Sequence, residues 1–168
     1  MSHKARIAED ALEAIAFSPD ERRLAVTFGY VVQLWDLTAP DPPAVPLLQG
    51  GHGQWILAVG FSPDGNWLAS AGIDATIKLW DLTAKDPASH PIPLNGHRAA
   101  VKTLAFSSTG RWLATAGQDA TARLWDLTDL TKPSVLLRGH ESPAVLADTL
   151  VRAGLAELPP RQQTVLSS

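Results

Sequence analysis

Two groups of polar side chains in this sequence combine the residue types that nucleophilic catalysis requires. Each group contains a histidine, a hydroxyl side chain, an aspartate and a tryptophan: His52, Ser70, Asp74 and Trp80, then His97, Thr115, Asp119 and Trp125. A hydroxyl activated by a histidine, which a carboxylate orients, is the nucleophile of many hydrolases. One hypothesis is therefore a hydrolase in which His52 acts with Ser70 or Asp74. The set occurs twice, however, whereas a catalytic site is needed once.

Metal binding is the second chemistry that the histidines suggest. His52, His97 and His140 each follow a glycine and recur at intervals of 45 and 43 residues. Zinc ligands must converge to about 2 Å from one ion, whereas residues at equivalent points of successive repeats diverge. The sequence has no cysteine, and it lacks the glycine patterns that bind phosphates or dinucleotides. We therefore expect no metal and no cofactor.

The two polar groups belong to a repeated stretch. The segment WLASAGIDATIKLWDLT at 67–83 returns as WLATAGQDATARLWDLT at 112–128, with differences at four of 17 positions. A more divergent copy, LAVTFGYVVQLWDL, occupies 24–37. Trp35, Trp80 and Trp125 are 45 residues apart each time. Repeats of this kind usually bury their apolar faces against one another.

A period of about 40–45 residues, with Gly-His early and Trp-Asp late, fits one four-stranded propeller blade per repeat. On these motifs residues 12–140 resemble the WD-repeat β-propeller family, and the Pro- and Asp-rich loops resemble those of its bacterial members. The resemblance implies an all-β fold, a partial propeller of three four-stranded antiparallel blades. It also implies a non-enzymatic scaffold that binds a protein or peptide partner.

The resemblance gives the two polar groups a structural role. In this family the Gly-His histidine is linked through a second-strand hydroxyl and a turn aspartate to a third-strand tryptophan, and both groups match that pattern. A buried imidazole or indole N–H needs a partner, and a satisfied network fixes the register of three strands. We therefore predict a structural relay. The first repeat lacks a preceding Gly-His and has a shorter Phe28-Gly29-Tyr30 turn without aspartate, so we expect it to be the least stable.

The composition argues against several classes of function. The formal net charge of −3 and the pI of about 5.9 argue against nucleic-acid binding, which usually needs a basic excess. No apolar run approaches the roughly 18 residues of a membrane span. The N-terminal stretch carries Glu9, Asp10 and Glu13 where a signal peptide would need an apolar core. We expect a cytoplasmic protein that binds neither nucleic acid nor membranes.

Short β-rich runs between turn residues predict the strands. They cover 12–17, 22–28, 31–36 and 44–48 in the first blade, 56–61, 67–71, 76–81 and 92–94 in the second, and 101–106, 112–116, 121–126 and 134–137 in the third. The repeats divide the chain into a polar N-terminal segment at 1–11, blades at about 12–50, 51–95 and 96–140, and a tail at 141–168.

The repeat pattern ends at His140, which lacks downstream partners and is expected to be solvated or used by another chain. In the tail, apolar residues recur at spacings that indicate a short amphipathic helix, Leu146, Leu150, Val151, Leu155 and Leu158. Pro159 would end this helix. Such a helix could cap an exposed blade edge. The alternative is a tail that does not fold.

A partner face is expected where the loops before the innermost strands meet the tight turns. Trp55 and Arg98 lie in these loops, and Ile73 and Gln118 lie in turns that, by the resemblance, open on the same face. Tryptophan and arginine are common anchors of protein interfaces. The alternative for Trp55 is packing against the neighbouring blade.

Three blades are fewer than the roughly four to eight that close a propeller. The faces of the first and third blades would therefore expose apolar side chains. Three answers stay open. Two chains could form a homodimer that closes a six-bladed ring, the chain could complete another protein's propeller, or it could be a fragment of a longer repeat protein.

Overall fold

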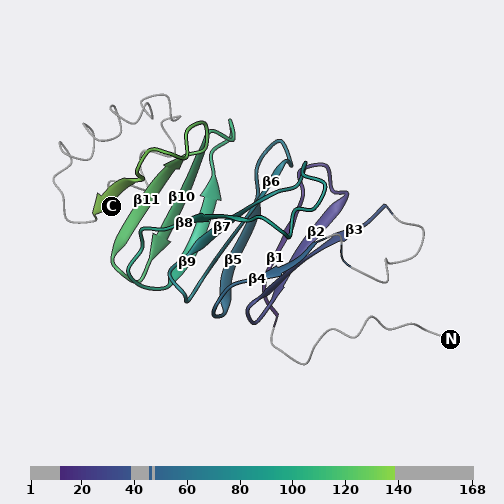
Figure 1. Cartoon of the computed structure of the whole chain (residues 1–168), viewed down its shortest axis with the longest axis horizontal. Helices are drawn as coiled ribbons and strands as arrows, with labels where there is room; N and C mark the ends of the chain where they lie inside the picture. Colours follow the sequence, from purple (N-terminus) through teal and green to yellow (C-terminus); the bar gives the residue numbers. More distant parts are fainter. Residues whose placement is uncertain (1–11, 39–45, 47, 139–168) are drawn as a thin grey trace.

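The described part of the chain forms three four-stranded antiparallel sheets. The structure, a computed structural model, describes residues 12–38, 46 and 48–138. In Figure 1 the first and third sheets stand on opposite sides of the second. The predicted fold class, three antiparallel blades of a partial propeller, is confirmed. The segment 1–11, the tail at 141–168 with its expected helix, and His140 lie outside the described residues.

The sheets follow the chain in order, and within each sheet the strands are neighbours in sequence. The first blade holds β1 (Leu12–Phe17), β2 (Arg23–Phe28), β3 (Val31–Asp36) and β4 (Leu48–Gly51). The second holds β5 (Ile56–Phe61), β6 (Trp67–Gly72), β7 (Ile77–Asp81) and β8 (Ile92–Leu94). The third holds β9 (Val101–Phe106), β10 (Trp112–Gly117), β11 (Thr121–Asp126) and β12 (Val135–Arg138). No helix within these residues is long and apolar enough to cross a membrane.

The turn between the first two strands of each blade is closed by its own side chains. In the second blade the Ser62 hydroxyl accepts the Trp67 N–H at 2.9 Å and donates to Asp64 at 2.5 Å. Gly65 completes this turn at a φ of 71°, in the left-handed region that glycine adopts without strain. The first blade places Glu21 there at a φ of 58°, which costs about 1 kcal/mol or more. At this turn only the first blade carries that cost, whereas the second and third blades hold Ala75 and Ala120 at φ values of 63° and 59° in their next turns.

Each sheet has two different apolar faces. On one face a phenylalanine, a leucine and a tryptophan lie side by side across three strands, as Phe61, Leu68 and Trp80 do in the second blade. We call the face with this ladder the leading face and the opposite one the trailing face. Side chains alternate between the two faces along every strand, so the strand register decides which residues each face presents.

The core consists of leading faces packed on the trailing faces of the preceding blades. Between the first and second blades the buried residues are Ala25, Val32, Leu34 and Leu48 on one side and Ile56, Leu68 and Trp80 on the other. Between the second and third they are Ala69, Ala71, Ile77, Leu79 and Leu94, facing Val101, Leu113 and Trp125. Neither face of the second blade is exposed to solvent, because a neighbouring blade covers each one.

The predicted fourth strand of the first blade is wrong in its position. It was expected at 44–48 from apolar side chains, but β4 runs over Leu48–Gly51, with Leu48 opposite Leu34 and Gly51 opposite Val31. The reason is the packing of the next blade, because the ring of Trp80 lies directly on Gly50. A residue without a side chain is needed at that point. The other predicted strands begin and end within one residue of the observed bounds.

Gly50→Ala is therefore expected to lower the free energy of unfolding by about 1–3 kcal/mol, as overpacking does. A Cβ at Gly50 would stand 2.5 Å from two ring carbons of Trp80, which is 1% exposed and cannot move aside freely. Urea unfolding would measure the loss. Gly53→Ala is the matched control, since its Cβ would meet only an Asp74 oxygen at 3.8 Å. Equal stabilities of the two variants would contradict the assignment of Gly50.

Candidate functional site

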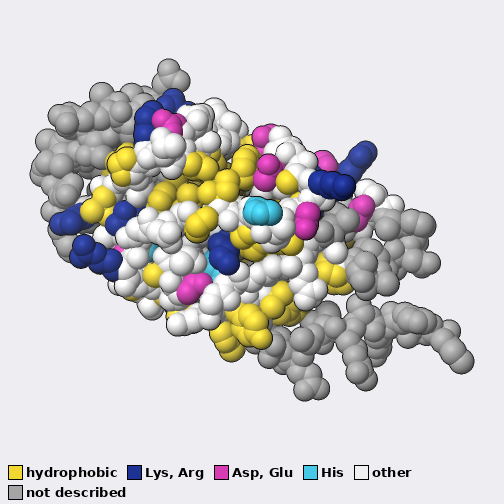
Figure 2. Space-filling model, in the orientation of Figure 1, with side chains coloured by type: hydrophobic (Ala, Val, Ile, Leu, Met, Phe, Trp, Pro, Cys, Tyr) yellow, Lys and Arg dark blue, Asp and Glu magenta, His cyan; other side chains and the backbone are white. Residues whose placement is uncertain are grey.

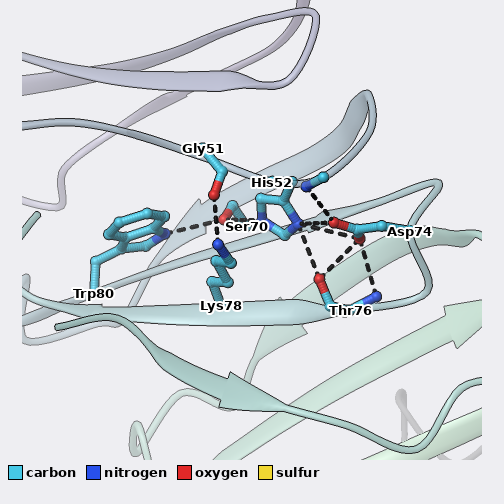
Figure 3. Close-up of polar contacts among 8 residues, drawn as sticks. Gly51, His52, Ser70, Asp74, Thr76, Lys78 and Trp80 are labelled. Carbon is cyan, nitrogen blue, oxygen red and sulfur yellow. Dashed lines mark hydrogen bonds and ion pairs between the residues drawn. The ribbon is translucent and has the colours of Figure 1, made fainter. Parts of the chain in front are cut away.

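The first polar group forms one continuous hydrogen-bonded chain across the second blade (Figure 3). His52 follows β4, and its Nε2 lies 2.7 Å from the Ser70 hydroxyl on β6. The indole N–H of Trp80 on β7 donates to the same hydroxyl at 3.0 Å. On the other side of the ring, Nδ1 lies 3.1 Å from an oxygen of Asp74 in the turn between β6 and β7. The chain thus ties two strands, a turn and the loop from the first blade together.

The turn itself holds Asp74 in place. The carboxylate accepts the backbone N–H of Thr76 at 3.1 Å and its hydroxyl at 2.8 Å, and it accepts the Gly53 N–H at 2.9 Å. Because the carboxylate accepts from Nδ1, we assign the proton of the neutral His52 ring to Nδ1. Nε2 then accepts from the Ser70 hydroxyl, which leaves the oxygen of Ser70 free to accept from Trp80. Every polar atom of this chain has a partner.

The third blade repeats the arrangement with a threonine in place of the serine. His97 Nε2 lies 2.9 Å from the Thr115 hydroxyl, to which the Trp125 indole donates at 3.0 Å. His97 Nδ1 lies 3.0 Å from Asp119. The backbone N–H of Arg98 donates to the same carboxylate at 2.9 Å, as Gly53 does in the second blade. The structure therefore brings both predicted groups together with the same partners.

Burial and hydrogen bonding set the charges in the chain. Burial lowers the pKa of His52 by more than the nearby Asp74 charge raises it, so the imidazole is neutral near pH 7. Burial raises the pKa of Asp74, but hydrogen bonds from Thr76 and the interaction with His52 outweigh it, and the net pKa is lowered. The pKa of Asp119 is also lowered, since hydrogen bonds from Arg98 and Thr121 outweigh its burial. Both carboxylates are ionised.

The connections of His52, Ser70 and Asp74 resemble those of a catalytic triad, but their surroundings differ. Ser70 is 0% exposed and Thr115 is 2% exposed. Each hydroxyl oxygen already accepts a tryptophan N–H. We therefore propose that the groups hold the strands together, as the sequence predicted. Within the described residues there is also no cluster of three histidine, aspartate or glutamate side chains suited to a metal ion.

The first blade fills the hydroxyl position with an apolar residue. The register places Val26 opposite Ile15 and Gln33, as Ser70 lies opposite Val59 and Lys78. Val26 is 8% exposed. A valine there has no polar atom for a histidine to satisfy, and this blade has no preceding Gly-His.

The residues of the predicted partner face all lie at one end of the blades, where β5 begins. Ile73 donates its N–H to the carbonyl of Trp55 at 2.8 Å, and Gln118 donates to Ala100 at the equivalent point of the third blade. Trp55 is 46% and Ile73 is 41% exposed, and Arg98 and Gln118 are exposed as well. This exposure favours the partner-face interpretation of Trp55 over packing on its neighbour.

Sequence reasoning missed Tyr30, which belongs to the same end. It stands in the turn between β2 and β3 and is 58% exposed, and its carbonyl accepts the His52 N–H at 2.8 Å. Figure 2 shows hydrophobic side chains gathered along the lower edge of the molecule, near the ends of β4 and β5. The sequence signal that could have indicated Tyr30 is its position in the β2–β3 turn, which is equivalent to the turn that holds Ile73. We call Tyr30, Trp55 and Ile73, with Arg98 and Gln118, the turn-end face.

Comparison with known proteins identifies the repeats. The family model for the WD domain, G-beta repeat, matches residues 46–81 and 90–126. These two segments are WD40 repeats. Its structure is similar to a crystal structure of RRP9 WD40 repeats, with 22% identity and a TM-score of 0.68, over 82% of this chain and 42% of that one. It is also similar to a structure of U3-55K, with 22% identity and a TM-score of 0.67 over the same shares.

The chain spans about two fifths of the length of those two structures, since it covers 42% of each. Their identity of 22% shows a common fold and no more. No curated protein matches the chain in sequence. The predicted resemblance to WD-repeat proteins is confirmed at the level of the repeats.

If the relay is structural, His52→Ala and His97→Ala should each lower the free energy of unfolding by about 1–3 kcal/mol. Each substitution leaves a buried hydroxyl and an aspartate without their histidine partner. Urea unfolding would measure the loss. His90→Ala is the control, because His90 is exposed and should change stability by less than about 0.5 kcal/mol. A His52→Ala chain that kept its stability but lost a hydrolytic turnover would contradict the relay.

The free energy of unfolding should also fall as the pH drops below 6.5. In the unfolded chain His52 takes up a proton near its ordinary pKa of 6.5, whereas in the folded chain its pKa is lower. The unfolded state then binds more protons, so acid favours it. A further loss is expected below pH 3.8, where Asp74 and Asp119 protonate in the unfolded chain first. Urea midpoints from pH 8 to pH 3 would show both losses.

The control for this pH dependence is His52→Gln, which cannot take up a proton. Its midpoint should change less between pH 7 and pH 5 than that of the wild-type chain. A stability that rises as the pH falls through this interval would contradict the neutral, buried imidazole.

Proposed function

We propose that this chain is a non-enzymatic interaction module whose turn-end face binds a protein or peptide segment. The observation that carries the proposal is the gathering of three exposed large apolar side chains on that face. Tyr30, Trp55 and Ile73 are 58%, 46% and 41% exposed. Hydrogen bonds between their turns and loops join the backbone segments of this face. A preorganised apolar surface of this kind loses little entropy on binding.

The composition of the turn-end face favours a protein partner. Aromatic residues and arginine dominate the binding energy of protein interfaces, and this face offers Tyr30, Trp55 and Arg98. The nearby Asp74 and Asp119 carboxylates are turned inward to the relay, so they add little negative charge at the surface. The net charge of −3 makes nucleic acid an unfavourable partner. The expected location is the cytoplasm.

Trp55→Ala should weaken binding of such a segment at least tenfold, as loss of an aromatic anchor does. Peptides selected on the immobilised wild-type chain from a random displayed library would serve as the probe, with dissociation constants from fluorescence anisotropy. Leu37→Ala is the matched control. Leu37 is also 46% exposed, but it follows β3 at the opposite end of the blade. Selected peptides that bind both variants equally well would contradict the turn-end face as the binding surface.

A second candidate function is that of a structural subunit which completes a larger propeller. It is favoured by the exposed apolar side chains of β1, Ile15 at 55% and Phe17 at 61%. Both side chains lie on a sheet face, and Phe17 borders the β1–β2 turn at the opposite end of the blade, so they do not belong to the turn-end face. A homodimer that closes a six-bladed ring is one form of this function, and a longer or separate chain that supplies the missing blades is another.

A further inference from the structure

A cavity of about 360 Å³ lies between the second and third blades, beside β8 at the outer edge of the second sheet. Pro93 and Leu94 line it from the second blade, and Trp125, Leu130 and Pro133 line it from the third. The two prolines are exposed, whereas Leu94 and Trp125 are 5% and 7% exposed, so the cavity reaches from solvent towards the core between the blades. Its volume falls in the range of roughly 300–1,000 Å³ that is typical of small-molecule sites. We call it the β8–β11 cavity.

Arg123 brings a positive charge to this mainly apolar lining. It lies on β11, and its Nη1 donates to the Ser134 hydroxyl at 2.9 Å. Among the described residues no carboxylate forms an ion pair with it. Its Nε–H is buried and has no hydrogen-bond partner there either. Buried donors are normally paired, and a guanidinium offers five N–H groups. These residues therefore leave both the charge and the hydrogen bonding of Arg123 incompletely satisfied.

The equivalent cation of the second blade is satisfied within the chain. Lys78 occupies on β7 the place of Arg123 on β11, and its Nζ donates to the Gly51 carbonyl at 2.5 Å. Arg123 instead lies close to Gly96, where a Cβ would stand 2.8 Å from Nη1 and 3.3 Å from Nε. Within the described part of the chain it makes no hydrogen bond to a backbone carbonyl. The third blade thus holds a longer, forked cation beside the cavity without that internal partner.

The other charged groups of the β8–β11 cavity are already paired. The Asp126 carboxylate accepts from Arg111 at 3.2 Å and from a hydroxyl of its own turn. Lys132, which is exposed, lies 3.3 Å from an oxygen of Asp129. Of the groups that line the cavity, Arg123 and Lys132 are positive and Asp126 is negative, which leaves one positive charge. A ligand with a single negative charge matches this balance.

We propose that the β8–β11 cavity binds a small apolar monocarboxylate, with its carboxylate on the Arg123 guanidinium and its hydrocarbon part against Trp125 and Leu94. The planar guanidinium fork matches the two oxygens of a carboxylate. Apolar walls with one charged group that fixes orientation are the usual design of a small-molecule site. A free carboxylic acid and the apolar C-terminal residue of a peptide share this chemistry.

This site goes beyond the proposed function and does not rest on it. None of the residues of the turn-end face lines the cavity. Strand β11 begins beside the turn of Asp119, and the cavity lies towards its other end, at Trp125 and Asp126. All the lining residues belong to the second and third blades, so the site requires no other blade.

The first test is isothermal titration calorimetry of the full chain with hexanoate as the probe. Binding should saturate at one site with a dissociation constant of about 1 mM or below, as expected for a ligand of this size. 1-Hexanol carries the same hydrocarbon part without the charge, and inorganic phosphate carries charge without the hydrocarbon part. Each should bind at least tenfold more weakly than hexanoate.

The second test removes the cation. Arg123→Met should weaken hexanoate binding at least tenfold and leave the chain folded, because no ion pair is lost. Arg123→Lys is a second variant, which places in the third blade the residue that the second blade holds at Lys78; it should also bind more weakly, since an ammonium lacks the fork. Arg22→Met is the matched control, because Arg22 is exposed in the first blade and should keep the wild-type affinity.

A direct readout is the Nε–H signal of Arg123 in a nitrogen-15 NMR spectrum, assigned by its loss in Arg123→Met. Hexanoate should shift this signal, and the shift should follow the calorimetric binding curve. Titrations with Gly-Gly-Leu and with its C-terminal amide separate the two sources of the carboxylate. Binding of the free tripeptide as tight as that of hexanoate would assign the ligand to a peptide C-terminus, whereas binding of hexanoate alone would assign it to a free acid.

Several outcomes would overturn the proposal. These are a wild-type chain that does not bind hexanoate, equal binding of 1-hexanol, an Arg123→Met chain with unchanged affinity, and an Arg22→Met chain with an equal loss. Trp55→Ala should keep hexanoate binding, and Arg123→Met should keep the binding of peptides selected on the turn-end face. The two proposals therefore fail separately.

Discussion

Each blade of this chain is apolar on both faces, and so a single blade cannot be stable in water. The ladder of Phe61, Leu68 and Trp80 leaves solvent only when another sheet lies against it. Burial of a leucine or a larger side chain contributes about 1.5–3 kcal/mol, and most of this gain arises between blades. Stability in such repeats is close to a sum of units and of nearest-neighbour contacts. The contact between blades is therefore the interaction on which the fold depends.

The polar relay provides hydrogen-bond partners for polar groups that this packing buries. An indole at the contact between blades carries an N–H that burial would leave without water, and Ser70 or Thr115 accepts it. The histidine and the aspartate then satisfy the hydroxyl and fasten the neighbouring loop. The first blade uses Val26 at the same point, which removes the need for the other partners. The burial of Ser70 and Thr115 favours a structural role for these residue types, and the histidine substitutions test it.

Much of this structure could be predicted, because aligning the three repeats indicates where the strands of each one lie. The sequence also indicated which residues form the relay, through a family pattern. The spacing of the motif residues does not predict the solvent exposure of Ser70. That exposure bears on whether the hydroxyl acts as a nucleophile or has a structural role. The position of β4 was missed, because it depends on a ring from the next blade, and Tyr30 was missed because exposure follows from three-dimensional packing.

Gly50 also bears on how the chain avoids misfolding. The second and third blades are nearly identical, so during folding either leading face could dock on the wrong neighbour. The Trp80 ring lies directly on Gly50, whereas the equivalent position in the second blade holds Leu94, which shares a buried cluster with Trp125. The absence of a side chain at Gly50 therefore distinguishes the first blade as the correct packing partner of the second. Near-duplicate repeats can keep their serial order through such a difference.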